Sequence, residues 1–456
     1  MHNNISINPA TGETIREYPS LSMEEIEEII DQSHDAWLQW RKVPILERAR
    51  LMKNAGAVLR KNKERYALIM TQEMGKPIAQ ARAEVEKSAW VCDFYAENAE
   101  SFLAPKLIET DATKSFVTYN PIGIVLAIMP WNFPFWQVLR FAAPGLMAGN
   151  VGLLKHASNV PGSAIAIEEV FEEAGFPDYV FKTLVMETSD VKHVIAHPKV
   201  RAATLTGSER AGKAVASQAG EALKKTVLEL GGSDPYIVLE DADLYETVTA
   251  CVFSRMLNSG QSCIAAKRFI VVQSVVEEFT RIFLEVAKGY KLGDPMEEGT
   301  NVGPMARVDL RDELHKQVLR SVTSGAKLLA GGTVPDRPGA WYPFTILGDV
   351  GPGMAVYHEE TFGPVAAIIP AIDEADAIRI ANDSEFGLGA AVFTRDVERG
   401  ERIAAEEIEA GSCFVNSFVK SDPRLPFGGI KISGYGRELS EEGIKEFVNI
   451  KTIYVK

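Results

Sequence analysis

Short apolar runs alternate with helical stretches along most of this chain, and this alternation constrains the fold more than any other feature. A first series contains IGIVLAIM, GNVGLLKH, FKTLVM and AATLTG, several of them separated by helical segments such as residues 161–174 and 191–196. A second series contains DPYIVLE, KRFIVVQ, PVAAIIPA, GAAVFT and GSCFVNS. Strands that alternate with helices form parallel sheets covered by helices. We therefore expect two α/β lobes, with the changeover near Gly231 and Gly232.

Two other segments depart from this pattern. Residues 22–100 place apolar side chains at helical spacings, and Ser22 and Glu25 fit a capping box at the start of that region. Residues 106–120 are typical of two polar-edged strands around the sequence DAT, with too little apolar area to be stable alone. The pattern predicts a helical opening layer and a hairpin that docks on another subunit or domain.

Composition and charge exclude several classes of protein. A chain of 456 residues suggests two or three structural units. Its formal net charge of −14 argues against a nucleic acid or an anionic membrane as partner. The N-terminus does not resemble a signal peptide, and the longest apolar run, residues 122–136, is short for a membrane span and contains two prolines. We expect a soluble, cytoplasmic protein.

Cysteine usage suggests neither a disulfide framework nor a zinc site. The four cysteines are scattered without a C-x-x-C pair: Cys92, Cys251, Cys263 and Cys413. In NSGQSCIAAKR, Cys263 is surrounded by small and amide-bearing residues, which leave its sulfur approachable. A small hydrophobe in a loop explains this stretch equally well, because free cysteine is among the most buried residue types. A nucleophilic cysteine would also need an oxyanion stabiliser and a base for water.

Two residues are candidates for these tasks. Asn132 lies in MPWNFPFW, in a proline-bracketed turn after an apolar run, where its amide can face a cleft; the alternative is an Asx turn. Glu229 ends an apolar strand in VLELGGSDP, where burial would raise the pKa of its carboxyl group as a general base requires. The alternative for Glu229 is an ion pair with Lys224 or Lys225.

An anion site is indicated by AATLTGSERAGKAV. A strand, a turn at Gly207 and Ser208, and a helix N-terminus together offer free N–H groups to a phosphate. The stretch is not G-x-G-x-x-G, so it is a weak dinucleotide fingerprint. LLKHASN places Lys155 and Ser158 at the end of another strand, where an open parallel sheet binds its ligand.

Taken together, these features resemble the aldehyde dehydrogenase superfamily over essentially the whole chain. Six ordered motifs carry the resemblance, and the interval from Glu229 to Cys263 also matches the family: PWNFP, LTGSERAG, LELGG, GQSC, EETFGPV and PFGGIKISGYGRE. The resemblance implies two Rossmann-like parallel-sheet lobes plus a β oligomerisation arm, and hence a homodimer or homotetramer. The expected divisions are a cofactor-binding domain at 1–103 and 122–231, a catalytic domain at 232–438, and an arm at 104–121 and 439–456.

The resemblance also implies a mechanism. Cys263 would attack the aldehyde carbon, and the amide of Asn132 with the backbone N–H of Cys263 would hold the resulting oxyanion. After hydride transfer to a nicotinamide cofactor, Glu229 would activate the water that hydrolyses the thioester. The residues expected to bind the cofactor are Trp131, Lys155, Ser158, Gly207, Ser208, Glu360 and Phe362.

Cofactor preference is inferred from one departure. Many NAD-preferring members of the family have a glutamate three residues after the lysine that matches Lys155, whereas this chain has Ser158. A carboxylate there would repel the 2′-phosphate of NADP, and a serine can accept it. We expect a preference for NADP with some use of NAD.

The substrate is inferred from Arg140, eight residues after Asn132. An arginine there is similar to family members that hold the carboxylate of succinate semialdehyde, a task suited to a guanidinium fork. The alternative is a surface arginine paired with an acidic neighbour. Phe133 and Ser421 are expected beside the same substrate, with Arg424 as a further candidate. The expected substrate is a short ω-semialdehyde acid, succinate semialdehyde first and glutarate semialdehyde second.

Other classes of protein fit less well. A cysteine hydrolase would need a histidine to activate the thiol, and none of the seven histidines lies where the family places catalytic groups. A non-catalytic descendant of the fold would not be expected to retain Cys263, Glu229 and Asn132. A relative that transfers the acyl group to coenzyme A is disfavoured because Glu229, the hydrolytic base, is present.

Overall fold

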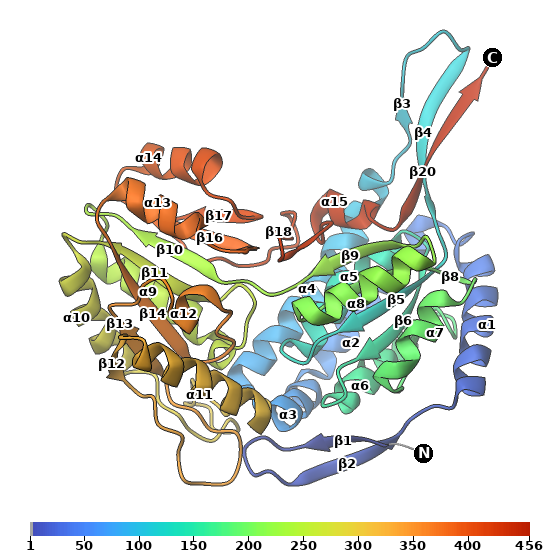
Figure 1. Cartoon of the computed structure of the whole chain (residues 1–456). Helices are drawn as coiled ribbons and strands as arrows, with labels where there is room; N and C mark the ends of the chain where they lie inside the picture. Colours follow the sequence, from blue (N-terminus) through green and yellow to red (C-terminus); the bar gives the residue numbers. More distant parts are fainter. Residues whose placement is uncertain (1–2) are drawn as a thin grey trace.

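The computed structural model describes residues 3–456 and contains two α/β lobes with a narrow β arm that projects away from them (Figure 1). One lobe is built on a six-stranded sheet of order β19-β9-β8-β5-β6-β7. The other is built on a seven-stranded sheet of order β12-β13-β14-β11-β10-β16-β17. The predicted α/β class and the two lobes are therefore confirmed, and the chain passes from the first sheet to the second at Gly231 and Gly232.

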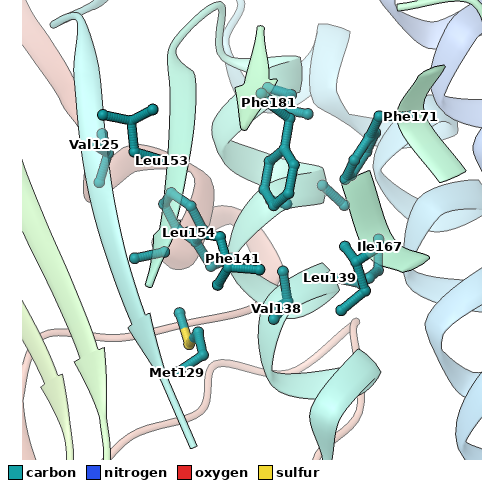
Figure 2. Close-up of a cluster of buried hydrophobic side chains, with 14 of the residues drawn as sticks. Val125, Met129, Val138, Leu139, Phe141, Leu153, Leu154, Ile167, Phe171 and Phe181 are labelled. Atoms are coloured by element: carbon teal, nitrogen blue, oxygen red, sulfur yellow. The ribbon is translucent and has the colours of Figure 1, made fainter. Parts of the chain in front are cut away.

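The first lobe follows the first series of apolar runs. Its parallel strands are β5 (Ile124–Met129), β6 (Val151–His156), β7 (Phe181–Thr183), β8 (Val200–Thr206) and β9 (Lys225–Glu229). The helices between and after them are α5 (Pro134–Met147), α6 (Pro161–Glu173), α7 (Val191–Ala196) and α8 (Glu209–Glu221). Figure 2 shows the core that α5 and α6 form against the sheet, with Leu139, Phe141 and Phe171 among its side chains.

Four helices open the chain after the hairpin of β1 (Asn3–Ile7) and β2 (Thr14–Pro19). They are α1 (Met23–Trp40), α2 (Ile45–Lys61), α3 (Lys63–Met74) and α4 (Ile78–Phe102). The predicted capping box is present, because Ser22 Oγ accepts from the Glu25 N–H and Glu25 Oε2 accepts from the Ser22 N–H. α4 packs against α2, α3 and α5, which brings it to the edge of the site described below.

The second lobe follows the second series of runs. Its parallel strands are β10 (Asp234–Val238), β11 (Ala266–Val272), β13 (Thr345–Gly348), β14 (Val365–Ala371), β16 (Gly389–Phe393) and β17 (Ser412–Val415), with β12 (Lys327–Ala330) antiparallel at one edge. Its helices are α9 (Leu244–Met256), α10 (Val276–Ala287), α11 (Val308–Thr323), α12 (Ala355–His358), α13 (Glu374–Asn382) and α14 (Val397–Arg402). Neighbouring strand residues such as Ile237 and Val238 belong to different core clusters, because alternate side chains face opposite sides of the sheet.

The arm is a three-stranded antiparallel sheet of β3 (Lys106–Leu107), β4 (Lys114–Pro121) and β20 (Val448–Val455), with α15 (Ser440–Lys445) at its base. The hairpin predicted at 106–120 is therefore present, and the C-terminal segment adds β20 to its edge. Between lobe and arm, β15 (Phe386–Gly387) pairs with β18 (Ile430–Lys431), and β19 (Gly434–Tyr435) returns to pair with β9. The domain divisions given above stay a prediction, and their first two residues lie outside the described chain.

Membrane insertion of a helix is not supported by the lengths and hydropathies observed. Within residues 3–456, no helix combines enough length with enough apolar character to cross a bilayer.

Candidate active site

Cys263 follows a loop with an unusual backbone. Asn258, Ser259 and Gly260 have φ angles of 56°, 53° and 76°, in the left-handed region that residues with a side chain seldom adopt. Such conformations cost about 1–3 kcal/mol each for residues other than glycine and persist where surrounding contacts enforce them. Here Asn258 Nδ2 donates to the carbonyl of Asn132 at 2.7 Å, and Ser259 Oγ accepts from the Gly303 N–H at 2.9 Å. The loop is held rigidly before its cysteine.

Gly260 is required for a second reason. A Cβ atom at this position would lie 2.3 Å from the carbonyl oxygen of Gly363, so no side chain fits without moving backbone. Gly232 has a similar role, since a Cβ there would lie 2.8 Å from the carbonyl oxygen of Cys263. The GQSC and LELGG motifs are therefore explained by close backbone approach around the nucleophile.

Cys263 lines a cavity of about 480 Å³, and both lobes contribute residues to its walls. The turn before α5 and α5 itself provide Phe133 and Arg140, and the loop after β17 provides Ser421. The structure thus brings the predicted nucleophile and the three predicted substrate-binding residues to one cavity. α4 adds Lys87, which sequence reasoning missed because a lysine in a long helix is usually solvated.

Asn132 lies in the turn between β5 and α5, beside the cysteine loop. Its Nδ2 donates to the carbonyl of Gln261 at 3.2 Å, so the amide reaches across to the nucleophile segment and does not form an Asx turn. Asn132 Oδ1 has no hydrogen-bond partner among residues 3–456. The Asn132 amide thus contacts Gln261, which lies two residues before Cys263 in the sequence. From this position it can donate to the negatively charged oxygen that forms when the sulfur bonds to a carbonyl carbon.

A buried ion pair clamps this turn. Glu84 Oε1 accepts from the N–H groups of Phe135 and Trp136, at 2.9 and 3.1 Å, which are free at the N-terminus of α5. The carboxylate of Glu84 is paired with Lys76, whose Nζ lies 3.9 Å from the centre of the Phe133 ring. Neither Lys76 nor Glu84 was identified from the sequence, because the groups that this pair contacts around the start of α5 lie more than fifty residues away in a different motif.

Glu229 ends β9 and is buried, with only 2% of its surface exposed. Neither of its carboxylate oxygens has a hydrogen-bond partner in the described chain. Burial and the nearby charge of Glu438 raise the pKa of Glu229 well above its usual range, as the sequence predicted. The alternative lysine pairs are excluded: Lys225 binds Glu446 and Lys224 donates to backbone carbonyls.

The thiol of Cys263 is protonated near neutrality. Burial raises its pKa to about 12, although the positive charges of Arg140 and Lys267 act in the opposite direction. Lys267 Nζ donates to the carbonyl oxygens of Ser262 and Cys263, at 3.0 and 2.6 Å, so it also fixes the backbone on either side of the sulfur. Attack by this thiol on a carbonyl carbon therefore requires a base.

Five of the predicted cofactor residues lie at or just after the carboxyl ends of parallel strands, where open α/β sheets bind ligands, whereas Glu360 and Phe362 lie in the loop before β14. Lys155 is near the end of β6 and Ser158 follows it. Gly207 and Ser208 connect β8 to α8, and Ser208 Oγ caps the helix by accepting from the Ala211 N–H at 3.3 Å. The N-terminus of α8 thus presents free N–H groups at the turn that was predicted to hold a pyrophosphate.

These residues fit a dinucleotide. Lys155 is buried, which lowers the pKa of its amine, and no acidic group in the described chain forms an ion pair with it. Glu360 Oε1 accepts from the Gly232 N–H at 2.9 Å and lies 3.4 Å from Lys267 Nζ, next to the cysteine loop. The rings of Trp131 and Phe362 are in edge contact, 5.7 Å between centres, and form an aromatic wall.

Arg140 is in the cavity wall but is not a free cation. It is buried and paired with Glu438, and its guanidinium lies 4.5 Å from the centre of the Phe427 ring. The alternative that Arg140 is a surface residue is therefore wrong, but the acidic partner expected under that alternative is present as Glu438. Arg424 is mostly exposed, pairs with Asp422 at 2.6 Å, and does not line the cavity.

Besides Arg140, two lysines line the cavity: the exposed Lys420 and the partly buried Lys87. Lys87 makes the closer contacts. Its Nζ donates to Ser421 Oγ at 2.8 Å and lies 4.2 Å from the centre of the Trp136 ring. Burial, together with the charge of Arg140, lowers the pKa of Lys87 to about 8.

Comparison with known proteins places these features in one family. The family model described as "Aldehyde dehydrogenase family" matches residues 2–453. A probable succinate-semialdehyde dehydrogenase [NADP(+)] of Synechocystis sp. is 49% identical, and the match covers 99% of each chain. The succinate semialdehyde dehydrogenase [NAD(P)+] Sad of Escherichia coli is also 49% identical, over 99% of this chain and 97% of the relative.

Solved structures agree in fold. The succinic semialdehyde dehydrogenase from Streptococcus pyogenes, determined in complex with NADP+, superposes with a TM-score of 0.97 at 39% identity and 99% coverage of both chains. The structure of Gox0499 superposes with a TM-score of 0.98 at 40% identity over the full length of both chains.

Proposed function

The chain belongs to the aldehyde dehydrogenase family, as its motifs predicted, and from this membership we propose that it oxidises succinate semialdehyde to succinate with NADP. The observation that carries the proposal is the cavity that holds Cys263 together with Arg140, Lys87 and Ser421. Succinate semialdehyde presents a carbonyl for the thiol and a carboxylate for the polar wall of the cavity, where Lys87 and Ser421 lie. Relatives named for this activity, at 46–49% identity over 99% of the chain, support the same substrate.

The reaction begins at Cys263. The thiol gives up its proton to solvent water, the sulfur forms a bond to the aldehyde carbon, and the carbonyl oxygen becomes an oxyanion. The Asn132 amide and the backbone N–H of Cys263 hold this oxyanion. One donor of this kind is worth about 3–4 kcal/mol in the barrier, so the rigid turn that presents Asn132 contributes directly to the rate.

A bound nicotinamide cofactor supplies the acceptor for the hydride that leaves the former aldehyde carbon. Lys155, Ser158 and the Gly207–Ser208 turn would hold its adenosine and phosphate portions, and Trp131, Glu360 and Phe362 its nicotinamide portion. The carbon is then joined to Cys263 as a thioester. Glu229 takes a proton from water, the hydroxide attacks the thioester, and succinate leaves as the thiol is restored. Aldehyde, water and oxidised cofactor give acid, reduced cofactor and one proton.

The preference for NADP rests on the pair of Lys155 and Ser158. Ser158 is exposed and lies three residues after a buried lysine that forms no ion pair in the described chain, although the charge of Glu187 acts on it, an arrangement that suits a 2′-phosphate. The names of the Synechocystis and Streptococcus relatives point to NADP, and that of the Escherichia coli relative includes both cofactors. We expect measurable use of NAD.

A substrate panel tests the proposal. Succinate semialdehyde, glutarate semialdehyde and butyraldehyde are compared by kcat/KM, each with NADP and with NAD, from the absorbance of the reduced cofactor. We expect the order to be as written, with NADP preferred throughout. Equal or better use of butyraldehyde would contradict the carboxylate-bearing substrate, and a preference for NAD would contradict the cofactor.

We also propose a cytoplasmic location and assembly into a homodimer or homotetramer through the arm. Cys92, Cys251, Cys263 and Cys413 are all free thiols, which suits a reducing compartment. The arm carries exposed apolar side chains that a partner subunit would cover, with 72% of Leu107 and 63% of Ile450 accessible.

A further inference from the structure

Three cations line the cavity, Arg140, Lys87 and Lys420, and they differ in how their charge is balanced. Arg140 forms a buried ion pair with Glu438, so its positive charge is already met by a carboxylate of the protein. Lys87 has no ion pair in the described chain. Its ammonium group donates a hydrogen bond to the hydroxyl of Ser421 and lies over the face of the Trp136 ring. Lys420 also lines the cavity without an ion pair in the described chain, but it is exposed to solvent. Lys87 is therefore the partly buried cation of the cavity whose charge is not balanced by an ion pair.

The carboxylates nearest to Lys87 are engaged elsewhere. Glu84 lies one helical turn before it on α4, but its oxygens bind Lys76 and the N-terminus of α5. Asp422 accepts from the guanidinium of Arg424 at 2.6 and 2.8 Å. Since residues three apart on a helix share a face, α4 uses Glu84 to hold the oxyanion turn and directs Lys87 toward the same cavity.

We propose that Lys87, together with Ser421, recognises the carboxylate of the substrate and so determines the preference for a semialdehyde acid over an uncharged aldehyde. This inference rests on the proposed function. The ammonium group has three donors and uses one on Ser421 Oγ. Because Ser421 accepts that bond, its own hydroxyl proton is free, and both groups can donate to one carboxylate. Trp136 covers the ammonium group and limits its access to water.

Lys87→Met tests the inference, since it removes the charge while it keeps an unbranched apolar chain against Trp136. We expect kcat/KM for succinate semialdehyde to fall by about thirtyfold or more, as when a buried charge loses its partner. The value for butyraldehyde should change by less than about threefold. Lys288→Met, which removes an exposed lysine of the second lobe, is the matched control and should leave both values unchanged.

Binding without turnover provides a second measurement. Succinate should protect Cys263 of the wild-type protein from alkylation by iodoacetamide, and this protection should be lost in Lys87→Met. If Lys87→Met does not fold, Lys87→Gln, which keeps a polar group for Ser421, is measured in the same way. A merely structural lysine would lower both kcat/KM values together and leave the protection by succinate in place.

The two proposals fail in different ways. A wild-type protein that does not prefer succinate semialdehyde to butyraldehyde contradicts the proposed function itself. A wild-type protein that has the preference, with a Lys87→Met variant that keeps both the same preference and the protection by succinate, overturns the assignment of Lys87 alone.

Discussion

Glu229 gives the sharpest test at the scale of single residues, because it is buried without a hydrogen-bond partner in the described chain. Glu229→Gln keeps the shape of the side chain but cannot take a proton from water. We expect the variant to release one equivalent of NADPH per subunit and then to stall as a thioester on Cys263. Stopped-flow absorbance measures the burst and mass spectrometry the bound acyl group. Unchanged steady-state turnover would require another base, and Glu441→Gln, on the exposed face of α15, serves as control.

Cofactor preference is predicted to depend on Ser158. Ser158→Glu would bring a carboxylate to the 2′-phosphate of NADP, and two like charges near a protein surface repel by up to about 4 kcal/mol before screening. We expect the ratio of kcat/KM for NADP to that for NAD to fall several-fold or more. Ser324→Glu, at the exposed end of α11, adds the same charge elsewhere and should leave the ratio unaltered. An unchanged ratio in Ser158→Glu would place the 2′-phosphate at another residue.

Lys87 predicts a pH dependence that separates recognition from chemistry. Its pKa is lowered to about 8 by burial and by Arg140 and Lys420, while Glu84 and Asp422 act in the opposite direction. The cation is present below that pH and is lost as the pH rises through it. Since kcat/KM reports groups of the free enzyme, the ratio of succinate semialdehyde to butyraldehyde should fall by up to about tenfold per pH unit above pH 8.

Taking the ratio of the two substrates removes the titration of Cys263 and Glu229, which both reactions share. Lys87→Arg is the control, because a guanidinium stays charged throughout this range. Its ratio should be constant between pH 6.5 and 9.5. A wild-type ratio that is equally constant would show that no titrating cation selects the substrate.

At the scale of secondary structure, the sequence predicted elements well because the elements are buried on both faces. Parallel strands covered by helices are continuous apolar runs, and such runs between helical stretches can be recognised without tertiary information. The residues at the ends of these strands, such as Lys155 and Glu229, could be predicted for the same reason. Each is placed by the register of its own strand.

The missed residues have their roles through contacts between elements. Lys87 becomes a cavity residue only because α4 packs against α5, and nothing in the helix sequence distinguishes it from a solvated lysine. The pairing of Arg140 with Glu438 joins α5 to the segment before α15, almost three hundred residues later. Periodicity describes one element at a time, so it could not show that the charge of Arg140 was already balanced.

The clamp between α4 and α5 predicts a coupled effect on stability. Glu84→Gln keeps an oxygen for the Phe135 N–H but leaves the buried ammonium of Lys76 without a counter-charge. Breaking a buried pair in this way costs about 3–5 kcal/mol. We expect a lower midpoint of urea unfolding. We also expect a lower kcat, because Glu84 holds the turn that positions Asn132. In the double variant Lys76→Met with Glu84→Gln, much of the lost stability should return. Additive losses in the double variant would contradict the pair.

At the scale of the whole molecule, a net charge of −14 surrounds a site that must bind two anions, the substrate and the cofactor. The long-range field of the protein therefore does not attract them. Local cations do this work at short range, where burial protects them from screening: Lys87 in the aldehyde cavity and Lys155 at the end of β6. The arrangement explains why charge counts alone excluded some partners yet could not indicate the substrate.

The arm carries the last prediction, which concerns assembly. It extends away from both lobes (Figure 1), and β20 is an edge strand whose outer backbone groups have no strand beside them in the described chain. An uncovered edge with exposed apolar side chains favours pairing with another chain. Ile450 and Tyr454 of β20 are 63% and 51% exposed, and their spacing along the strand puts them on one face of the arm. We expect this other chain to be a second copy of the same protein, because a copy is present in any solution of the protein.

We expect light scattering to give the mass of a dimer or tetramer of the 50.0 kDa chain. Ile450→Lys with Tyr454→Lys should give a monomer, because two charges on that face would have to be buried against the partner. Ile372→Lys, which changes an exposed isoleucine after β14, should assemble normally. The lining residues of the aldehyde cavity in the described chain all lie outside the arm, so each subunit should keep its own active site. A wild-type monomer, or a double variant of unchanged mass, would show that the arm does not join subunits.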